Sequence, residues 1–200
     1  MAAENLVRTG GGIVSAAAGP LLLVSNLLDL GGDTEYGTVL GGILVLAAHV
    51  ALVFALVASY AAQTERSGLL RSLGMVLGVV GTTLVSGVML VEIAGASGAA
   101  VDVVLATGLP SALAVLGGWA FLIGLIVFGI ATMRPGVFPR WAGLLLIVGD
   151  VVFGAASFAG TATIISEIIG ALITCAALVW LGLSLLSGSG TSVGQPARVR

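Results

Sequence analysis

The chain contains no lysine, and it has one histidine and one cysteine among its 200 residues. Without lysine it cannot form the Schiff base that binds retinal or pyridoxal cofactors. The single histidine, His49, cannot supply a bis-histidine haem or a multi-histidine metal site within one chain. Cys175 has no partner for an internal disulfide. We therefore expect no metal and no other cofactor in this protein.

Motifs of enzymatic chemistry are missing as well. The sequence has no His-Glu-x-x-His pair for zinc and no glycine-rich phosphate loop with a lysine. Hydroxyl residues are scattered along the chain, and only His49 could act as a base beside one of them. Because an intramembrane hydrolase would have to rest on that single histidine, we expect a protein that is not an enzyme.

Charge is scarce throughout. Charged residues make up 8% of the chain, against about 25% in an ordinary soluble domain. Hydrophobic residues make up 58%, and the mean hydropathy is +1.22. A soluble fold of this size cannot hide so much apolar surface. The composition excludes a soluble enzyme, a disordered chain and a nucleic-acid-binding protein, and it predicts that the lipid bilayer surrounds most of the chain.

Six apolar stretches are long enough to cross a bilayer as helices, which takes about 20 residues. None shows the period-two alternation of an outer-membrane barrel strand. The predicted fold is therefore all-α: a polytopic transmembrane bundle of six spans within one domain, residues 1–187. Residues 188–200 are predicted to form a disordered cytoplasmic tail. The predicted spans are residues 11–30, 39–62, 69–94, 111–133, 141–160 and 163–187.

The arginines predict the orientation of the chain. With six spans, all of them fall on one side of the membrane, whereas a five- or seven-span chain would divide them. Because positive residues are retained in the cytoplasm, we expect both the N-terminus and the C-terminus to be cytoplasmic. The arginines are Arg8, Arg66, Arg71, Arg134, Arg140, Arg198 and Arg200.

A repeated pattern opens each odd-numbered span. An arginine is followed three residues later by a glycine, and the arginines concerned are Arg8, Arg71 and Arg140. This regularity predicts three helical hairpins of a common design. The alternative is that glycine and a flanking arginine are simply frequent at span ends. Among the 31 glycines, the pair Gly74 and Gly78 predicts a close helix–helix contact.

Ionisable residues at membrane depth are candidate functional groups, because burying them in lipid is costly. At 1.5 Å per residue, Asp150 and His49 each lie about 14–15 Å from the nearer end of their spans, close to the midplane. Glu167 lies about 6 Å below the outer boundary. These three residues form a candidate proton or ion site. The alternative is that Asp150 is protonated and bonded to a neighbouring helix, and that His49 is a satisfied lone histidine.

Three further polar residues are predicted near the outer surface. Asp29 and Glu92 end the first and third spans, and Asn26 shares a helix face with Asp29. They form a candidate outer mouth, unless the two acids are merely solvated at helix ends. No acid or histidine lies in the inner halves of the predicted spans. A transport pathway would therefore be polar in its outer half and apolar in its inner half.

The stretch Phe138 to Gly149, which includes Pro139-Arg140-Trp141-Ala142-Gly143, is similar to a segment of small six-helix prokaryotic integral membrane proteins. Those proteins belong to families of unknown function. The resemblance implies six helices in a prokaryotic cell (inner) membrane, and it implies no activity.

Two functions remain open from the sequence. The protein moves protons, ions or a small solute through a polar intramembrane centre. Alternatively, it is a non-catalytic structural or accessory subunit that packs through glycine-rich helix faces. In that case its partner is a second copy of the chain or another membrane protein.

Overall fold

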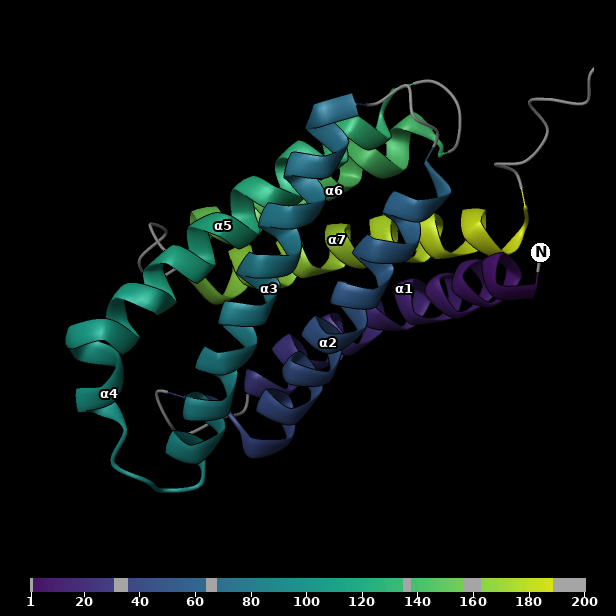
Figure 1. The fold of residues 1–200 in the computed structure, drawn as a ribbon. Helices are drawn as coiled ribbons and strands as arrows, with labels where there is room; N and C mark the ends of the chain where they lie inside the picture. Colours follow the sequence, from purple (N-terminus) through teal and green to yellow (C-terminus); the bar gives the residue numbers. More distant parts are fainter. Residues whose placement is uncertain (1, 31–35, 64–67, 135–137, 157–162, 189–200) are drawn as a thin grey trace, which may run out of the picture.

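The computed structural model describes residues 2–30, 36–63, 68–134, 138–156 and 163–188, and the secondary structure in these ranges is entirely helical. The predicted all-α fold class is confirmed for this part of the chain. Figure 1 shows the helices packed against one another in an elongated bundle. They are α1 (Ala2–Asp29), α2 (Val39–Ala62), α3 (Gly68–Ala96), α4 (Asp102–Ala106), α5 (Gly108–Thr132), α6 (Arg140–Ala155) and α7 (Thr163–Leu186).

Five of these helices are long and apolar enough to cross a membrane: α1 from Leu6 onward, α2, α3, α5 and α7. A helix satisfies its own backbone hydrogen bonds, which is the condition for lying in lipid. The chain is therefore a membrane-embedded helical protein. Helix α6 has 16 residues, fewer than the roughly 20 that cross a bilayer. A sixth span stays a prediction.

The helices can be compared with the predicted spans. Helix α2 begins and ends at the predicted residues, 39 and 62. Helix α1 begins at Ala2, earlier than the predicted span, because hydropathy marks only the apolar part of a longer helix. Helix α6 ends at Ala155, and the last predicted residues of that span lie outside the described ranges. The tail that we predict to be disordered also lies outside them from residue 189 onward.

The six longer helices form a closed ring in which each packs mainly against two neighbours, and α2 also contacts α7 across the ring. The order around the ring is α1, α2, α3, α5, α6, α7 and back to α1. Neighbouring helices run antiparallel, so Figure 1 shows the start of α1 beside the end of α7. The short helix α4 packs against α5. The ring thus consists of three successive antiparallel pairs, α1–α2, α3–α5 and α6–α7.

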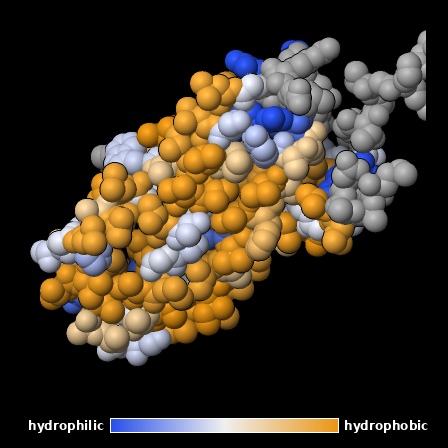
Figure 2. Space-filling model, viewed as in Figure 1, coloured by the Kyte–Doolittle hydropathy of each residue, from blue (hydrophilic) through white to orange (hydrophobic). Residues whose placement is uncertain are grey.

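The two ends of the ring carry charges of opposite sign. We call the end where α1 begins the arginine end, after Arg8, Arg71, Arg134 and Arg140. We call the other end the acidic end, after Asp29, Glu92, Asp102 and Glu167. On the face seen in Figure 2, apolar side chains cover most of the surface between the ends, and hydrophilic residues gather near the ends. Such a surface suits a lipid solvent.

Glycines bring the helix backbones close together. A Cβ added at Gly81 of α3 would lie 2.1 Å from the backbone nitrogen of Phe121 on α5. Gly74 and Gly78 of α3 also lie against α5, and Gly78 faces Gly124 backbone to backbone. The predicted contact at this glycine pair is therefore present. In lipid, where no hydrophobic force joins helices, such close packing is the main attraction between them.

The hydrophobic core fills the half of the ring nearer the arginine end. Its largest fully buried side chains are Phe128, Leu125, Leu146 and Leu181. They stand in the second halves of α5 and α7 and in the first half of α6, which all lie toward that end. Dense contacts among large side chains close the ring there.

Candidate functional site

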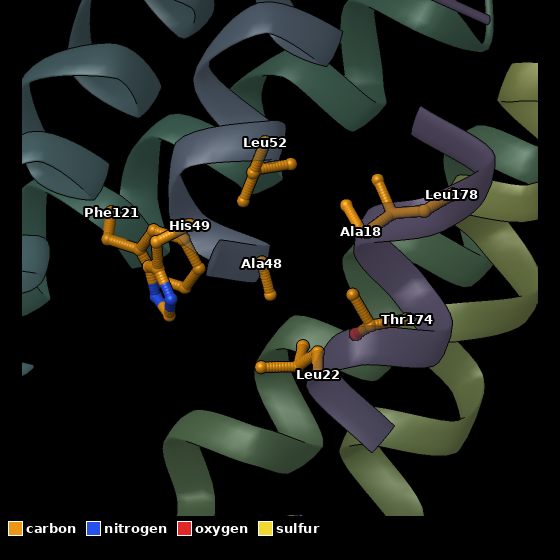
Figure 3. A pocket seen from close by; sticks show the side chains of 8 residues that line it. All are labelled: Ala18, Leu22, Ala48, His49, Leu52, Phe121, Thr174 and Leu178. Atoms are coloured by element: carbon orange, nitrogen blue, oxygen red, sulfur yellow. The ribbon is translucent and has the colours of Figure 1, made fainter. Parts of the chain in front are cut away.

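His49 lies on the wall of a small cavity between α1, α2, α5 and α7. The cavity measures about 20 Å³, enough for one molecule of the size of water. Figure 3 shows His49 beside Phe121 on one side and Thr174 on the other side. Although His49 and Thr174 are polar residues, the surface of the cavity is entirely apolar, so they line it through carbon atoms. The lining residues are Ala18, Leu22, Ala48, His49, Leu52, Phe121, Thr174 and Leu178.

The imidazole of His49 is held by its own helix and by an aromatic ring. Its Nδ1 lies 2.8 Å from the carbonyl oxygen of Val45. A carbonyl only accepts hydrogen bonds, so Nδ1 carries a hydrogen and donates it. In the neutral ring, Nε2 then keeps a free lone pair. The ring centroids of His49 and Phe121 are 5.5 Å apart. The histidine therefore has one satisfied nitrogen and one nitrogen left to accept a proton or a hydrogen bond.

Asp150 lies inside the ring, with 3% of its surface exposed. Its helical neighbours on the same face, Ile147 and Gly154, contact Gly129 and Leu122 of α5. Its Oδ2 atom is buried and has no hydrogen-bond partner among the described residues. The bond to a neighbouring helix that we considered from the sequence is not formed within this part of the chain. A buried carboxyl oxygen without a partner is rare and calls for a specific explanation.

His49 and Asp150 are not bonded to each other within the described ranges, and Thr174 provides the link between their surroundings. On one side Thr174 lines the cavity of His49. On the other side it packs against the turn of α6 that carries Asp150, since a Cβ added at Gly149 would lie 2.4 Å from Thr174 Oγ1. Thr174 is 6% exposed, and no described residue forms a hydrogen bond with its hydroxyl. The two sequence-predicted residues are neighbours of one threonine rather than a pair.

The acidic end brings together Asp29 of α1, Glu92 of α3 and Glu167 of α7. The carboxylate of Asp29 lies close enough to both glutamates to interact with them electrostatically. All three side chains are partly exposed. Like charges repel, so the packing of the ring holds them near one another and creates a negative potential at this end. We call these three residues the acidic mouth.

Asp29 has a structural role that the sequence did not reveal. Its Oδ1 accepts hydrogen bonds from the backbone nitrogen and the hydroxyl of Thr38, at 2.8 and 3.1 Å. The Thr38 hydroxyl in turn accepts from the nitrogen of Gly41, which caps the start of α2. A Cβ at Gly37 or Gly41 would lie 2.6 or 2.2 Å from Asp29 Oδ1. Asp29 therefore links α1 to α2 through hydrogen bonds. In the sequence, the sign of this link was the position of Thr38 directly before the predicted span 39–62.

Asn26 does not join the acidic mouth through a hydrogen bond. Its Nδ2 donates to the carbonyl oxygen of Leu22, one turn back on the same helix, at 2.8 Å. The mouth and the cavity nevertheless share the inward faces of α1 and α7. Leu22 on the cavity wall lies two turns, about 10 Å, from Asp29 along α1. Thr174 lies the same distance from Glu167 along α7.

A second polar cluster, at the arginine end, was also missed from the sequence. Arg71 of α3 donates to the carbonyl oxygen of Gln63 and stacks on the ring of Tyr60, 4.4 Å from its centroid. The Gln63 amide donates to the hydroxyl of Thr132 on α5, at 3.2 Å. Gln63 is 8% exposed. These contacts tie α2, α3 and α5 together where the hydrophobic core ends.

Known proteins add no further identification. Within the described ranges, no group of three or more histidine, cysteine or acidic residues is arranged to hold a metal ion. No protein-family model, no curated protein and no solved structure matches the chain. The fold and the site define the protein as a membrane-embedded helical ring with ionisable residues inside it. Its resemblance to six-helix prokaryotic membrane families stays a prediction.

Proposed function

We propose that the protein moves protons, ions or a small solute across a prokaryotic cell membrane, along the axis of its helix ring. The observation that supports this function is the acidic mouth, where Asp29, Glu92 and Glu167 converge from three helices. Two turns further along the same helix faces lies the cavity of His49. Glu92 and Glu167 repel Asp29 and form no hydrogen bond with a described residue, and ionisable groups in membrane spans typically mark a pathway.

The pathway in this conformation is polar in its acidic half and closed in its arginine half. Phe128, Leu125 and Leu181 belong to the core that fills the arginine half. In this proposal a solute enters at the acidic mouth and passes to the cavity, and it leaves on the other side only when helices move apart. Asp150 is the group to which we assign proton binding within the ring, because it is buried and its Oδ2 lacks a partner among the described residues.

In this proposal the chain crosses the membrane six times, with α6 and the residues after it as the fifth span. The acidic end faces outward, and both termini are cytoplasmic. Support comes from the arginines of the described ranges, which all lie at the end where α1 begins.

Flux measurements in reconstituted vesicles test the proposed function. The purified protein is placed in vesicles, and proton or solute movement is followed under an imposed gradient. We expect protein-dependent flux that falls strongly in Asp150→Asn and in Glu167→Gln. The matched control is Asp102→Asn, because Asp102 is exposed on α4, accepts a hydrogen bond from Tyr36 and is not part of the acidic mouth. If the flux is unchanged in both Asp150→Asn and Glu167→Gln, the two acids have a structural role and do not take part in transport.

A structural or accessory role is the second candidate, and two exposed glycines favour it. Gly87 of α3 and Gly118 of α5 have no atom within 4 Å of an added Cβ. Both are exposed, so they offer small-residue contacts to a helix of another protein or of a second copy. Gly87→Leu and Gly118→Leu would then disrupt assembly in detergent, whereas a transporter that works alone would tolerate both.

A further inference from the structure

The arginines of the arginine end differ in what they contact. Arg8 lies against the end of α7, and Arg71 donates a hydrogen bond to the carbonyl oxygen of Gln63. By contrast, Arg134 and Arg140 are exposed, and no described residue forms a hydrogen bond or an ion pair with either guanidinium group. These two positive charges are therefore available to a partner outside the described part of the chain.

The connection from α5 to α6 holds the two arginines near each other. A Cβ added at Gly143 of α6 would lie 2.6 Å from the carbonyl oxygen of Gly129 on α5 and 3.2 Å from the backbone nitrogen of Met133. Arg134 directly follows Met133, and Arg140 lies one turn, about 4.5 Å, before Gly143 along α6. The tight contact between the two helix ends therefore fixes the backbones that carry both guanidinium groups.

No acid with a described side chain neutralises this arginine pair. Such acids lie at the acidic end, apart from Asp150, which is buried inside the ring about 15 Å along α6 from Arg140. A guanidinium group binds a phosphate group through two parallel N–H donors. Two neighbouring guanidinium groups at the surface of a membrane protein therefore suit a ligand that carries phosphate.

An apolar surface continues from the arginine pair along the outer face of α6. Trp141 is 65% exposed, and Val148 and Val151 are 40% and 47% exposed. At about 100° per residue, these side chains lie on the same side of the helix as Arg140. A tryptophan ring favours the headgroup level of a membrane, and the two valines suit an acyl chain. A soluble phosphate would gain nothing from this apolar face.

We infer that Arg134, Arg140 and Trp141 form a binding site for an anionic phospholipid. The lipid phosphate binds the two guanidinium groups, and an acyl chain lies along the outer face of α6. Phosphatidylglycerol has the required net negative charge, whereas the quaternary ammonium of phosphatidylcholine offsets the charge of its phosphate. The site lies outside the ring and goes beyond the proposed transport along its axis, so it does not depend on the solute.

Lipid titration of the full-length protein in detergent tests the inference. Phosphatidylglycerol and phosphatidylcholine with the same acyl chains are added separately, and bound lipid is counted by native mass spectrometry. We expect phosphatidylglycerol to bind more tightly, and Arg134→Gln and Arg140→Gln each to weaken its binding about fivefold. Arg8→Gln is the matched control, because it removes the same charge from the same end and should keep the wild-type affinity. Equal binding of both lipids, or an equal loss in Arg8→Gln, would overturn the inference.

Two exposed tryptophans and a soluble competitor distinguish a lipid from a free phosphate compound. Trp141→Leu should weaken phosphatidylglycerol binding, whereas Trp119→Leu should not, because Trp119 is exposed on α5 about 20 Å before Thr132. Glycerol phosphate at the concentration of the lipid should not displace phosphatidylglycerol, since it lacks acyl chains. Displacement by glycerol phosphate would identify a site for a soluble anion and contradict the lipid site, and so would equal binding in the two tryptophan variants.

Discussion

At the scale of single residues, the structure separates the acids into two kinds. Asp29 is bonded to Thr38 and holds a hairpin together, whereas Asp150 is buried with an oxygen that has no partner among the described residues. Hydropathy and depth made Asp150 a candidate for the intramembrane site and Asp29 a candidate for the outer mouth. Their bonds distinguish them, because a bonded carboxylate stabilises the fold and an unbonded one destabilises it.

Replacing Asp150 by leucine should therefore not destabilise the fold through a lost hydrogen bond. Removing a buried polar group that lacks a partner relieves a cost of about 1–3 kcal/mol, and the leucine side chain has the same branching and the same number of heavy atoms. We expect Asp150→Leu and Asp150→Asn to unfold at or above the wild-type temperature in detergent. A fall of several degrees in both variants would reveal a partner for this carboxyl.

Replacing Asp29 by alanine should have the opposite effect on stability. The substitution removes the acceptor of two hydrogen bonds from Thr38 and leaves the partly buried start of α2 without its support, at a cost of about 1–3 kcal/mol. Asp29→Asn keeps an acceptor oxygen and should cost less. Thermal unfolding of the two variants checks this order. Equal stabilities would contradict a stabilising link between α1 and α2 through Asp29.

At the scale of helices, close glycine contacts determine which faces meet. A side chain at Gly81 would collide with the backbone of Phe121, while Gly87 on the same helix faces open space. We expect Gly81→Ala to lower the free energy of unfolding by about 1–3 kcal/mol or more, because overpacking separates the helices. Gly87→Ala should be neutral or stabilise by up to about 1 kcal/mol, because alanine favours the helix. Denaturant titration of both variants measures the difference, and equal losses would contradict glycine-mediated packing.

The sequence predicted the bounds of the helices better than it predicted which helices pack against one another. Helix α2 has the predicted bounds because polar residues, Thr38 and Gln63, flank a mostly apolar run. Helix α1 extends to Ala2 because its polar first turns carry no signal that a hydropathy scan detects. The approach of Glu92 to Asp29 depends on the order of helices around the ring. Contacts between distant helices are not encoded in the periodicity of one helix, so this convergence needed the structure.

At the scale of the whole molecule, the charges of the two ends predict the orientation in the membrane. Positive residues are retained in the cytoplasm, so the arginine end should face inward. In a Cys175→Ala background, Ser97→Cys should react with an impermeant thiol reagent from outside the cell, and Gly188→Cys should react only after the cells are opened. Labelling of both cysteines from the same side would contradict an orientation with the acidic end outside.

The central claim also concerns the whole molecule: the helix ring has a polar half toward the acidic end and a closed apolar half toward the arginine end. The initial rate of flux into reconstituted vesicles tests it most directly when wild type is compared with the double variant Glu92→Gln Glu167→Gln. Both substitutions keep the shape of the acidic mouth and remove two of its charges. We predict that the double variant loses most of the protein-dependent flux while it unfolds at the wild-type temperature or above. Unchanged flux in a folded double variant would contradict entry through the acidic mouth.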